Sequence, residues 1–203
     1  MVGPLRVRPD VPLSFPVEAE SRFLRFPADF TIKGMFLARL LSLAPRAALG
    51  NVGKSLLNPA VLKRCLPFAD YPQVDYSRLA HVVAQEAYRN LAVAEAMRRL
   101  ARQDIRTFAE SQVGRILLAL SGDATATLLK LPEMYRAALR GGSVQSTRLN
   151  AHTVQLHYKN FYGWLDCYPI GTIEGLAAHF ARGCEIEVAM ETLISATYTV
   201  TLH

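Results

Sequence analysis

The stretch ALGNVGKS, from Ala48 to Ser55, matches the relaxed form of a phosphate-binding P-loop. A working P-loop follows a buried strand and opens a helix, so that its backbone N–H groups point at phosphate. Here the preceding MFLARLLSLAPRA has helical spacing, and Ala48 stands where the stringent motif has its first glycine. We therefore expect a turn between two helices with Lys54 in solvent, and we keep a nucleotide-binding enzyme only as an alternative.

The histidines and cysteines do not have the spacing of a metal site. His152 and His157 fall on extended chain at an odd separation, which points them to opposite faces. Cys167 and Cys184 lack the close pairing of a zinc site, and such cysteines commonly pack as small apolar residues. We expect no metal and no cofactor. One histidine is enough to ligate a haem and leaves no spacing signature, so a haem-binding gas sensor remains an alternative.

Groups for covalent catalysis are also missing from the sequence. There is no G-x-S-x-G motif and no cysteine with a recognisable catalytic partner, so we predict no catalytic residues and a non-enzymatic protein. Arg98, Arg102 and Arg106 recur at four-residue steps beside an apolar helix face. Because no aromatic residues that could stack on bases are interleaved with them, we expect their stems to cover apolar surface. The net charge of +6 is spread along the chain, and we expect no nucleic-acid partner.

The elements that must position any site change their period at residue 142. Before it, helical spacing dominates, as in FTIKGMFLARLLSLA and EAMRRLARQDIRTFAESQVGRILLAL. After it, SVQSTRLN and HTVQLHYKN alternate, GTIEGLAAHFARG returns to helical spacing, and CEIEVAME and ISATYTVTL alternate again. We predict an α+β fold in which N-terminal helices pack on a small C-terminal antiparallel sheet, with strands and helix in the order β-β-α-β-β.

The chain divides into a tail and one domain. Residues 1–20 are predicted to be a Pro-rich N-terminal tail, because four prolines there break regular structure, and residues 21–203 form a single α+β domain. Regular strands are expected only after residue 142. No signal peptide and no run of about 18 apolar residues occurs. With three widely spaced cysteines, this predicts a cytoplasmic protein without a membrane span.

Two further features bear on packing. Gly175 lies inside the helical segment TIEGLAAHF, where glycine is unfavourable, so we expect a close approach of another element there. The segment RILLALSG is apolar nearly all round, and the MFLARLLSLA helix has a broad apolar face. Broad apolar faces are usually buried, and a twofold partner is the commonest way to bury them. We therefore predict a homodimer built on helices.

Several phrases of the sequence, taken in order, resemble a family of uncharacterised proteins of about this length, largely confined to myxobacteria. The resemblance covers roughly residues 15–203 and brings no activity with it. The phrases are FPADFTIKGMFLARLL, YPQVDYSRLAHVVAQEAYRN, EAMRRLARQDIRTFAESQVGRILLAL, LPEMYRAAL and GTIEGLAAHFARG.

A second, more distant resemblance lies in WLDCYPIGTIEGL, followed by Gly183-Cys184 and two alternating strands. This pattern is similar to the end of the vinyl-4-reductase-type, haem–nitric-oxide-binding and TRAPP-component folds. The resemblance implies several helices on a twisted antiparallel sheet, in proteins that bind small apolar molecules, haem or acyl chains, or act as dimeric adaptors. The haem branch has a proximal histidine. The only histidine of the long helices here is His81, and no clear signature accompanies it, so that ligand has no convincing counterpart in this sequence.

These observations together predict a non-enzymatic small-molecule-sensing or adaptor protein with an apolar pocket between helices and sheet. The alternative is a ligand-free homodimeric module for protein–protein interaction. An apolar small molecule is the expected partner, besides a second copy of the chain. Six side chains are predicted to line the pocket: Phe36, Leu40, Tyr88, Phe108, Trp164 and Tyr168.

Overall fold

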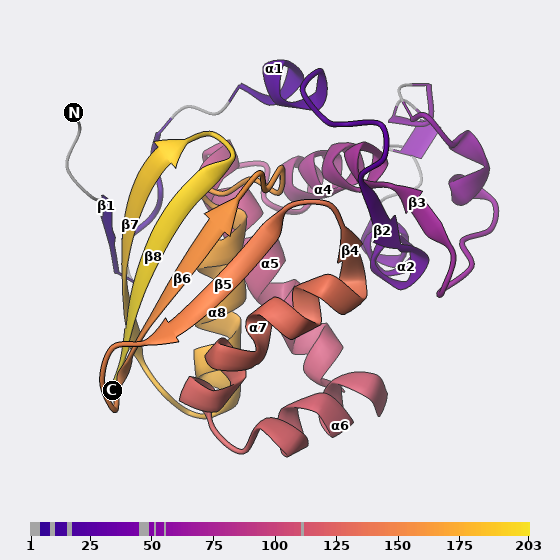
Figure 1. Ribbon diagram of the computed structural model, residues 1–203. Helices are drawn as coiled ribbons and strands as arrows, with labels where there is room; N and C mark the ends of the chain where they lie inside the picture. Colours follow the sequence, from indigo (N-terminus) through magenta and orange to yellow (C-terminus); the bar gives the residue numbers. More distant parts are fainter. Residues whose placement is uncertain are drawn as a thin grey trace.

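The computed structural model describes residues 5–8, 11–15, 18–44, 49–50, 52–54, 56–110 and 112–203. A five-stranded antiparallel sheet forms one side of the molecule (Figure 1). In β6 (Thr153–Lys159), Val154, Leu156 and Tyr158 are all buried, so the alternation predicted for this segment is confirmed. In spatial order the strands are β1 Leu5–Val7, β7 Cys184–Thr192, β8 Ser195–Leu202, β6 Thr153–Lys159 and β5 Ser143–Arg148.

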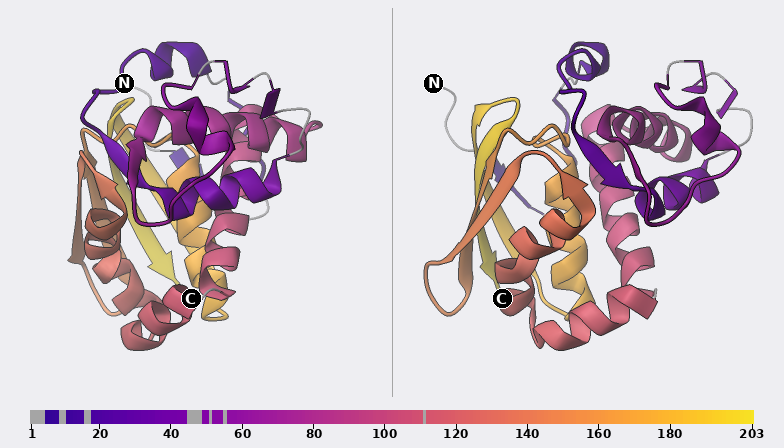
Figure 2. Two further views of the ribbon diagram at one scale, coloured as in Figure 1. Left: turned by 90° about the vertical axis from the view of Figure 1, so that its right-hand side faces the viewer. Right: turned by 45° about the vertical axis from the view of Figure 1, so that its right-hand side comes forward.

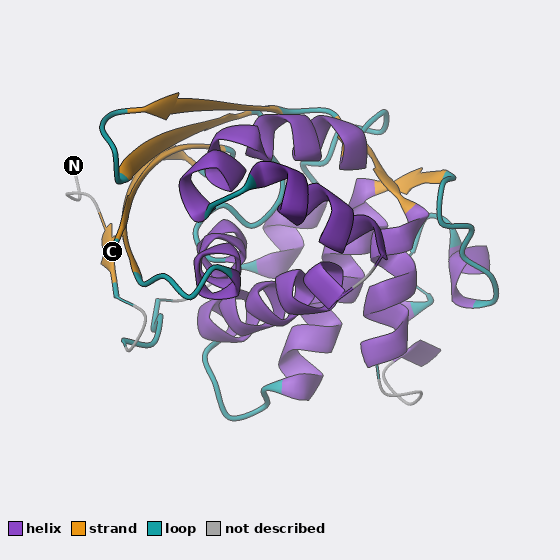
Figure 3. Cartoon of the chain, turned by 90° about the horizontal axis from the view of Figure 1, so that it is seen from below, coloured by secondary structure: helices purple, strands orange, loops and turns teal. Residues whose placement is uncertain are grey.

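Helices pack against one face of this sheet, which curves along them (Figure 3). Helix α8 (Tyr168–His179) lies between the sheet and α5 (Val93–Glu110), and α2 (Gly34–Leu43) and α4 (Gln73–Ala87) lie beyond α5 (Figure 2). The buried side chains of the sheet and of these helices form one continuous hydrophobic core. The helices are α1 Ala19–Phe23, α2 Gly34–Leu43, α4 Gln73–Ala87, α5 Val93–Glu110, α6 Gln112–Ser121, α7 Ala124–Ala138 and α8 Tyr168–His179, with a short 3-10 helix at Pro59–Leu62.

Local sequence explains where two of these helices begin. At the start of α7, the Asp123 side chain accepts a hydrogen bond from the Ala126 N–H at 2.7 Å, which caps the first turn. Helix α8 has Pro169 in its first turn, where no backbone N–H is needed. Tyr168 is the first residue of α8, and its hydroxyl contacts Tyr76 of α4 and Asp104 of α5.

A second, three-stranded antiparallel sheet joins the N-terminal helices to α7. Its strands, in spatial order, are β3 Asp70–Pro72, β2 Thr31–Lys33 and β4 Leu139–Arg140. Ile32 of β2 is paired with Tyr71 on one side and with Leu139 on the other. This small sheet holds the start of α2, the start of α4 and the end of α7 close together.

The α+β class and the antiparallel sheet agree with the sequence prediction, but the detailed arrangement differs. The expectation that regular strands begin only after residue 142 is wrong, because β1, β2, β3 and β4 precede it. Each of these strands has only two or three residues, which is too short to show a period of two. The C-terminal sheet is also completed by β1, which pairs antiparallel with β7.

The described parts of the predicted tail, residues 5–8 and 11–15, lie against the domain. Leu5–Val7 pairs with β7, and Leu13 is buried. The guanidinium of Arg98 donates to the carbonyl oxygens of Arg8 and Val11, both at 2.8 Å. Proline flanks the three-residue strand in the sequence without interrupting it, which is why composition alone did not indicate a strand.

Arg98 is fully buried and does not cover the helix flank as its spacing suggested. Its guanidinium donates to both carboxylate oxygens of Glu174 on α8, with an Nε to Oε2 distance of 3.0 Å, and to Glu95 at 3.1 Å. Burying a guanidinium is costly unless it is paired in this way. The pair therefore ties α5 to α8 and, through the backbone contacts of Arg98, to the N-terminal segment.

Two glycines of α8 allow α5 and α8 to approach closely. A Cβ added at Gly171 would lie 1.9 Å from the Arg98 carbonyl oxygen, and one added at Gly175 would lie 3.0 Å from the Ile105 Cβ. The close approach predicted at Gly175 is therefore confirmed, and Gly171 is the tighter of the two positions.

The P-loop-like stretch lies partly outside the described residues, since Ala48, Asn51 and Ser55 are not among them. Helix α2 precedes it in the described chain, and Lys54 is exposed.

Across the helices in the described ranges, none combines the length and the hydrophobicity that crossing a membrane requires.

Candidate ligand-binding cavity

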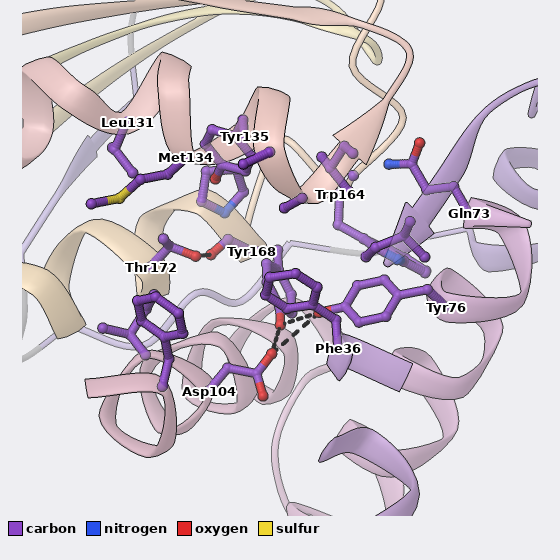
Figure 4. Close-up of a pocket in the computed structure, with 18 of the residues that line it drawn as sticks. Phe36, Gln73, Tyr76, Asp104, Leu131, Met134, Tyr135, Trp164, Tyr168 and Thr172 are labelled. Carbon is purple, nitrogen blue, oxygen red and sulfur yellow. Dashed lines mark hydrogen bonds between the residues drawn. The ribbon is translucent and has the colours of Figure 1, made fainter. Parts of the chain in front are cut away.

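A cavity of about 220 Å³ lies among α2, α4, α5, α7 and α8, beside the loop that carries Phe161 and Trp164 (Figure 4). The small sheet that brings the starts of α2 and α4 to the end of α7 places their side chains around this space. Most of its wall is carbon, and the apolar side chains include Met35, Phe36, Phe108, Leu131, Met134 and Leu176. Such a wall favours an apolar ligand.

One wall of the cavity holds a polar group that we call the Asp104 cluster: Arg39, Tyr76, Asp104 and Tyr168. The Arg39 Nε donates to Asp104 Oδ1 at 2.8 Å. The Tyr76 hydroxyl lies 3.2 Å from Asp104 Oδ2 and 2.7 Å from the Tyr168 hydroxyl, which also donates to Oδ2. The four residues come from α2, α4, α5 and α8, so the cluster joins four helices at one point. Figure 4 shows the contacts among Tyr76, Asp104 and Tyr168.

The protonation of the cluster follows from its burial. Burial and, after it, the Asp104 carboxylate raise the pKa of Tyr76 and of Tyr168 well above 10.0, so both phenols are neutral. Burial lowers the pKa of Arg39, but Asp104 outweighs it and holds that pKa above its ordinary value. The guanidinium and the carboxylate thus neutralise each other, and the cluster carries no net charge.

Two buried polar atoms of residues that line the cavity have no hydrogen-bond partner within the described part of the chain. They are Gln73 Oε1 and Ser77 Oγ, and their residues are only 4% and 1% exposed. Both belong to α4, one turn apart, and so lie on the same face of the helix. Native proteins rarely leave buried polar atoms unpaired, so these two atoms require an explanation.

Four of the six predicted lining residues lie in the wall of this cavity: Phe36, Phe108, Trp164 and Tyr168. Leu40, one turn beyond Phe36 on α2, is fully buried in the core and does not line the cavity. Tyr88 lines a separate groove between α5 and α8. That any of these side chains binds a ligand stays a prediction.

The sequence prediction missed the polar side of the cavity: Arg39, Gln73, Tyr76, Ser77 and Asp104. One signal was available. Asp104 lies within the helical segment EAMRRLARQDIRTFAESQVGRILLAL, directly before the apolar Ile105, and an acid beside an apolar helix face is a candidate for burial. The other residues have no distinguishing pattern, because only the tertiary arrangement brings α2, α4 and α8 to the same point.

The groove beside Tyr88 has a volume of about 700 Å³ and includes arginines of α5. These arginines already have acidic partners. Arg99 pairs with Glu95, and Arg102 pairs with Glu174 at 2.6 Å. The third arginine, Arg106, lies 3.5 Å from Glu110. Since their charges are largely balanced, the groove is a weaker candidate for binding an anion than its composition suggests.

Comparison with known proteins identifies both a family and a fold. The family described as "Protein of unknown function (DUF2378)" matches residues 27–201. The comparison with curated proteins gives no match. The structure is similar to the Fe(II) unliganded H-NOX protein from K. algicida, with a TM-score of 0.65 at 14% identity, covering 85% of this chain and 97% of that one.

Two other H-NOX structures give the same result. An H-NOX mutant from T. tengcongensis has a TM-score of 0.59 at 18% identity and covers 83% of this chain and 94% of its own. An oxygen complex of an H-NOX domain related to soluble guanylate cyclases has a TM-score of 0.59 at 18% identity, covering 83% of this chain and 90% of that one. The fold is therefore H-NOX-like, and of the three predicted fold resemblances the haem–nitric-oxide-binding one is confirmed. The vinyl-4-reductase and TRAPP resemblances and the restriction to myxobacteria stay predictions.

The similar H-NOX structures include an Fe(II) protein and one described by its haem redox potential, so a haem is the group that this fold would imply. Among the described residues that line it, none is a histidine or a cysteine. His81 packs face to face on Trp164, with ring centroids 5.5 Å apart, and is not part of the lining. The cavity volume is below the ~300–1,000 Å³ usual for drug-sized ligands. The residues present do not fit a haem held by histidine or cysteine.

Proposed function

We propose that this chain, which belongs to the DUF2378 family, is a non-enzymatic sensing domain that binds a small apolar molecule in the cavity beside the Asp104 cluster. The observation that carries the proposal is the cavity itself, an apolar space with a neutral polar cluster in one wall. The similarity to H-NOX structures supports the binding of a small molecule, since one of them is an oxygen-binding domain related to soluble guanylate cyclases.

The position of the cavity suggests how binding would be sensed. Its wall includes Phe36 of α2, Tyr76 of α4, Met134 of α7 and Tyr168 of α8, so one ligand would touch elements from both ends of the chain. A ligand that binds one arrangement of these helices better than another shifts the population toward it. In this proposal, α2 and α4 move relative to α8 and the sheet when the cavity fills.

Filling the cavity with a side chain tests the proposal. Native mass spectrometry of the protein as purified, and of protein incubated with 4-propyltoluene, should show a bound small molecule. Met134→Trp places a bulky group in the wall and should abolish that binding. Glu133→Trp adds the same group at the adjacent, exposed position of α7 and should not. Absence of any bound molecule from the unmodified protein, or equal binding by both variants, would overturn the proposal.

A homodimeric interaction module is a second candidate, favoured by an apolar surface on α6. Ile116, Leu117 and Leu120 are 55%, 38% and 70% exposed on this short helix. Exposed apolar side chains grouped in this way commonly mark an interaction site. In this candidate, a second copy of the chain covers α6.

A haem-binding gas sensor is supported by the fold and is disfavoured by the cavity lining described above. The visible absorption spectrum distinguishes it from the main proposal. The purified protein, incubated with haem, should show no Soret band of a ligated haem after gel filtration. A stable band would favour the haem candidate instead.

A further inference from the structure

The guanidinium of Arg39 has hydrogen-bonding capacity that the Asp104 cluster does not use. A guanidinium carries five N–H donors, and here the Nε–H pairs with Asp104 Oδ1. Within the described part of the chain, the two terminal nitrogens of Arg39 have no hydrogen-bond partner, and neither is fully shut off from solvent. The N–H groups of these two nitrogens therefore remain for water or for a ligand.

The surroundings of this guanidinium place it at the cavity. Arg39 is itself a lining residue, and its Nε bonds to Asp104, which also lines the cavity. Its Cζ atom lies 5.7 Å from the ring centroid of Phe36, another lining residue. The side chain of Arg39 is 15% exposed, against 4% for that of Asp104. The guanidinium thus lies between two parts of the wall and keeps surface that a small molecule can reach.

Asp104 does not need the remaining N–H groups of Arg39. Its Oδ1 accepts from the Arg39 Nε, and its Oδ2 accepts from Tyr168 and lies 3.2 Å from the Tyr76 hydroxyl. Both carboxylate oxygens therefore have donors from within the chain. The two terminal nitrogens form the outer edge of a guanidinium, and this edge can present a parallel pair of N–H bonds to another acceptor.

A carboxylate is the group that matches such a pair. Its two oxygens fit two parallel N–H bonds, and charge-assisted hydrogen bonds of this kind are roughly twice as strong as neutral ones. A ligand cation would meet the positive guanidinium. A phosphate monoester would bring nearly two negative charges close to Asp104, whereas a carboxylate brings one.

The cavity volume sets the size of the apolar part of the ligand. A cavity of about 150 Å³ is known to hold benzene, and this one measures about 220 Å³. By that ratio it takes about nine non-hydrogen atoms. Most of these would contact carbon, since most of the wall is made of apolar side chains.

We infer that the ligand is a small amphipathic monocarboxylate, whose apolar part fills the cavity and whose carboxylate pairs with the terminal N–H groups of Arg39. This inference rests on the proposed function, because it adds a polar end to the small apolar molecule of the same cavity. It assigns Arg39 as the residue that recognises that end.

The test uses two probes of the same shape, 4-propylbenzoate and 1-nitro-4-propylbenzene, which differ in a carboxylate against a neutral nitro group. Calorimetry gives the ratio of their dissociation constants for the full chain and for Arg39→Gln, whose amide can still donate to Asp104 but carries no charge. We expect the variant to shift this ratio at least tenfold against the benzoate, which is about 1.4 kcal/mol. Comparing ratios cancels the different hydration of the two probes.

Two other variants serve as controls. Arg64→Gln removes the same charge at an exposed position outside the cavity lining and should leave the ratio unchanged. Arg39→Lys keeps the charge but not the two-point fork, so it should shift the ratio by about threefold. If circular dichroism shows that Arg39→Gln does not fold, Arg39→Lys takes its place in the test.

The possible results separate the inference from the proposed function. If 4-propyltoluene binds but 4-propylbenzoate does not, the inference is overturned while the proposed function stands. The same holds if both probes bind and the ratio is unchanged in the Arg39 variants, or shifts equally in Arg64→Gln. If none of the three compounds binds the unmodified chain, both are overturned.

Discussion

Gly171→Ala tests the reasoning on how α5 and α8 are positioned. The added Cβ would lie 1.9 Å from the Arg98 carbonyl oxygen, whereas real Cβ contacts are essentially never closer than 3.0 Å. The two helices would therefore have to separate by about 1.1 Å, the difference between these distances. The obstacle is backbone of a buried helix, so no side chain can rotate away from it. We expect the variant to be destabilised.

The magnitude follows from two opposing effects. Replacing glycine with alanine inside a helix stabilises by about 1 kcal/mol. Overpacking a well-packed interior costs about 1–3 kcal/mol, and a backbone obstacle favours the upper end. The free energy of unfolding should therefore fall by about 2 kcal/mol. For a chain of this size, the melting temperature should fall by roughly 4–8 °C.

Thermal unfolding followed by circular dichroism measures this change, with two other glycines for comparison. Gly50→Ala adds a Cβ with no atom within 4 Å, so it should leave the melting temperature unchanged or raise it. Gly175→Ala, 3.0 Å from the Ile105 Cβ, should give a smaller loss than Gly171→Ala. A Gly171→Ala protein that melts at or above the temperature of the unmodified protein would refute the close packing of α5 on α8.

Three other predictions concern nucleotides, assembly and pH. Lys54→Ala should not alter ATP or GTP binding in calorimetry, because we expect none, and a signal that this substitution removes would contradict our interpretation of ALGNVGKS. Sedimentation equilibrium should give a dimer that Leu120→Glu weakens, since Leu120 is exposed on α6, and a mass of 22.5 kDa at every loading would exclude it. Burial lowers the pKa of His81 below 6.5, so the stability that its neutral form contributes is present above that pH and is lost as the pH falls through the lowered pKa. The melting temperature should therefore fall less between about pH 7 and pH 5 for His81→Phe than for the unmodified protein, and an equal fall would argue against this effect.

The longer elements could be predicted from the sequence because each has its own period. The alternation of HTVQLHYKN and ISATYTVTL gives β6 and β8, and the helical spacing of GTIEGLAAHFARG gives α8. The short strands could not be predicted, since three residues such as Leu5–Val7 show no period and depend on pairing with a distant strand.

The cavity could be predicted only through its aromatic residues. Large side chains such as Phe36 and Trp164 are candidates for any pocket, and both lie in the wall. Leu40 and Tyr88 were equally plausible from the sequence but lie elsewhere, because the rotation of each helix about its axis depends on tertiary packing. Gln73 and Ser77 have no sequence signal at all, since a polar residue on an amphipathic helix is normally assigned to the solvated face.

The Asp104 cluster accounts for how the fold keeps an open space between its helices. A cavity forfeits the contacts that its lining atoms would otherwise make, so the helices around it need another source of cohesion. The bonds of Arg39, Tyr76 and Tyr168 to Asp104 supply this between α2, α4, α5 and α8, and the Arg98–Glu174 pair supplies it again between α5 and α8. Charged and hydroxyl groups buried in this way lose much of their stabilising effect if one partner moves. In the proposed function, a ligand that fills the space beside Tyr76 and Tyr168 would act on the contacts that hold the four helices together, and this would supply the coupling that a sensing domain requires.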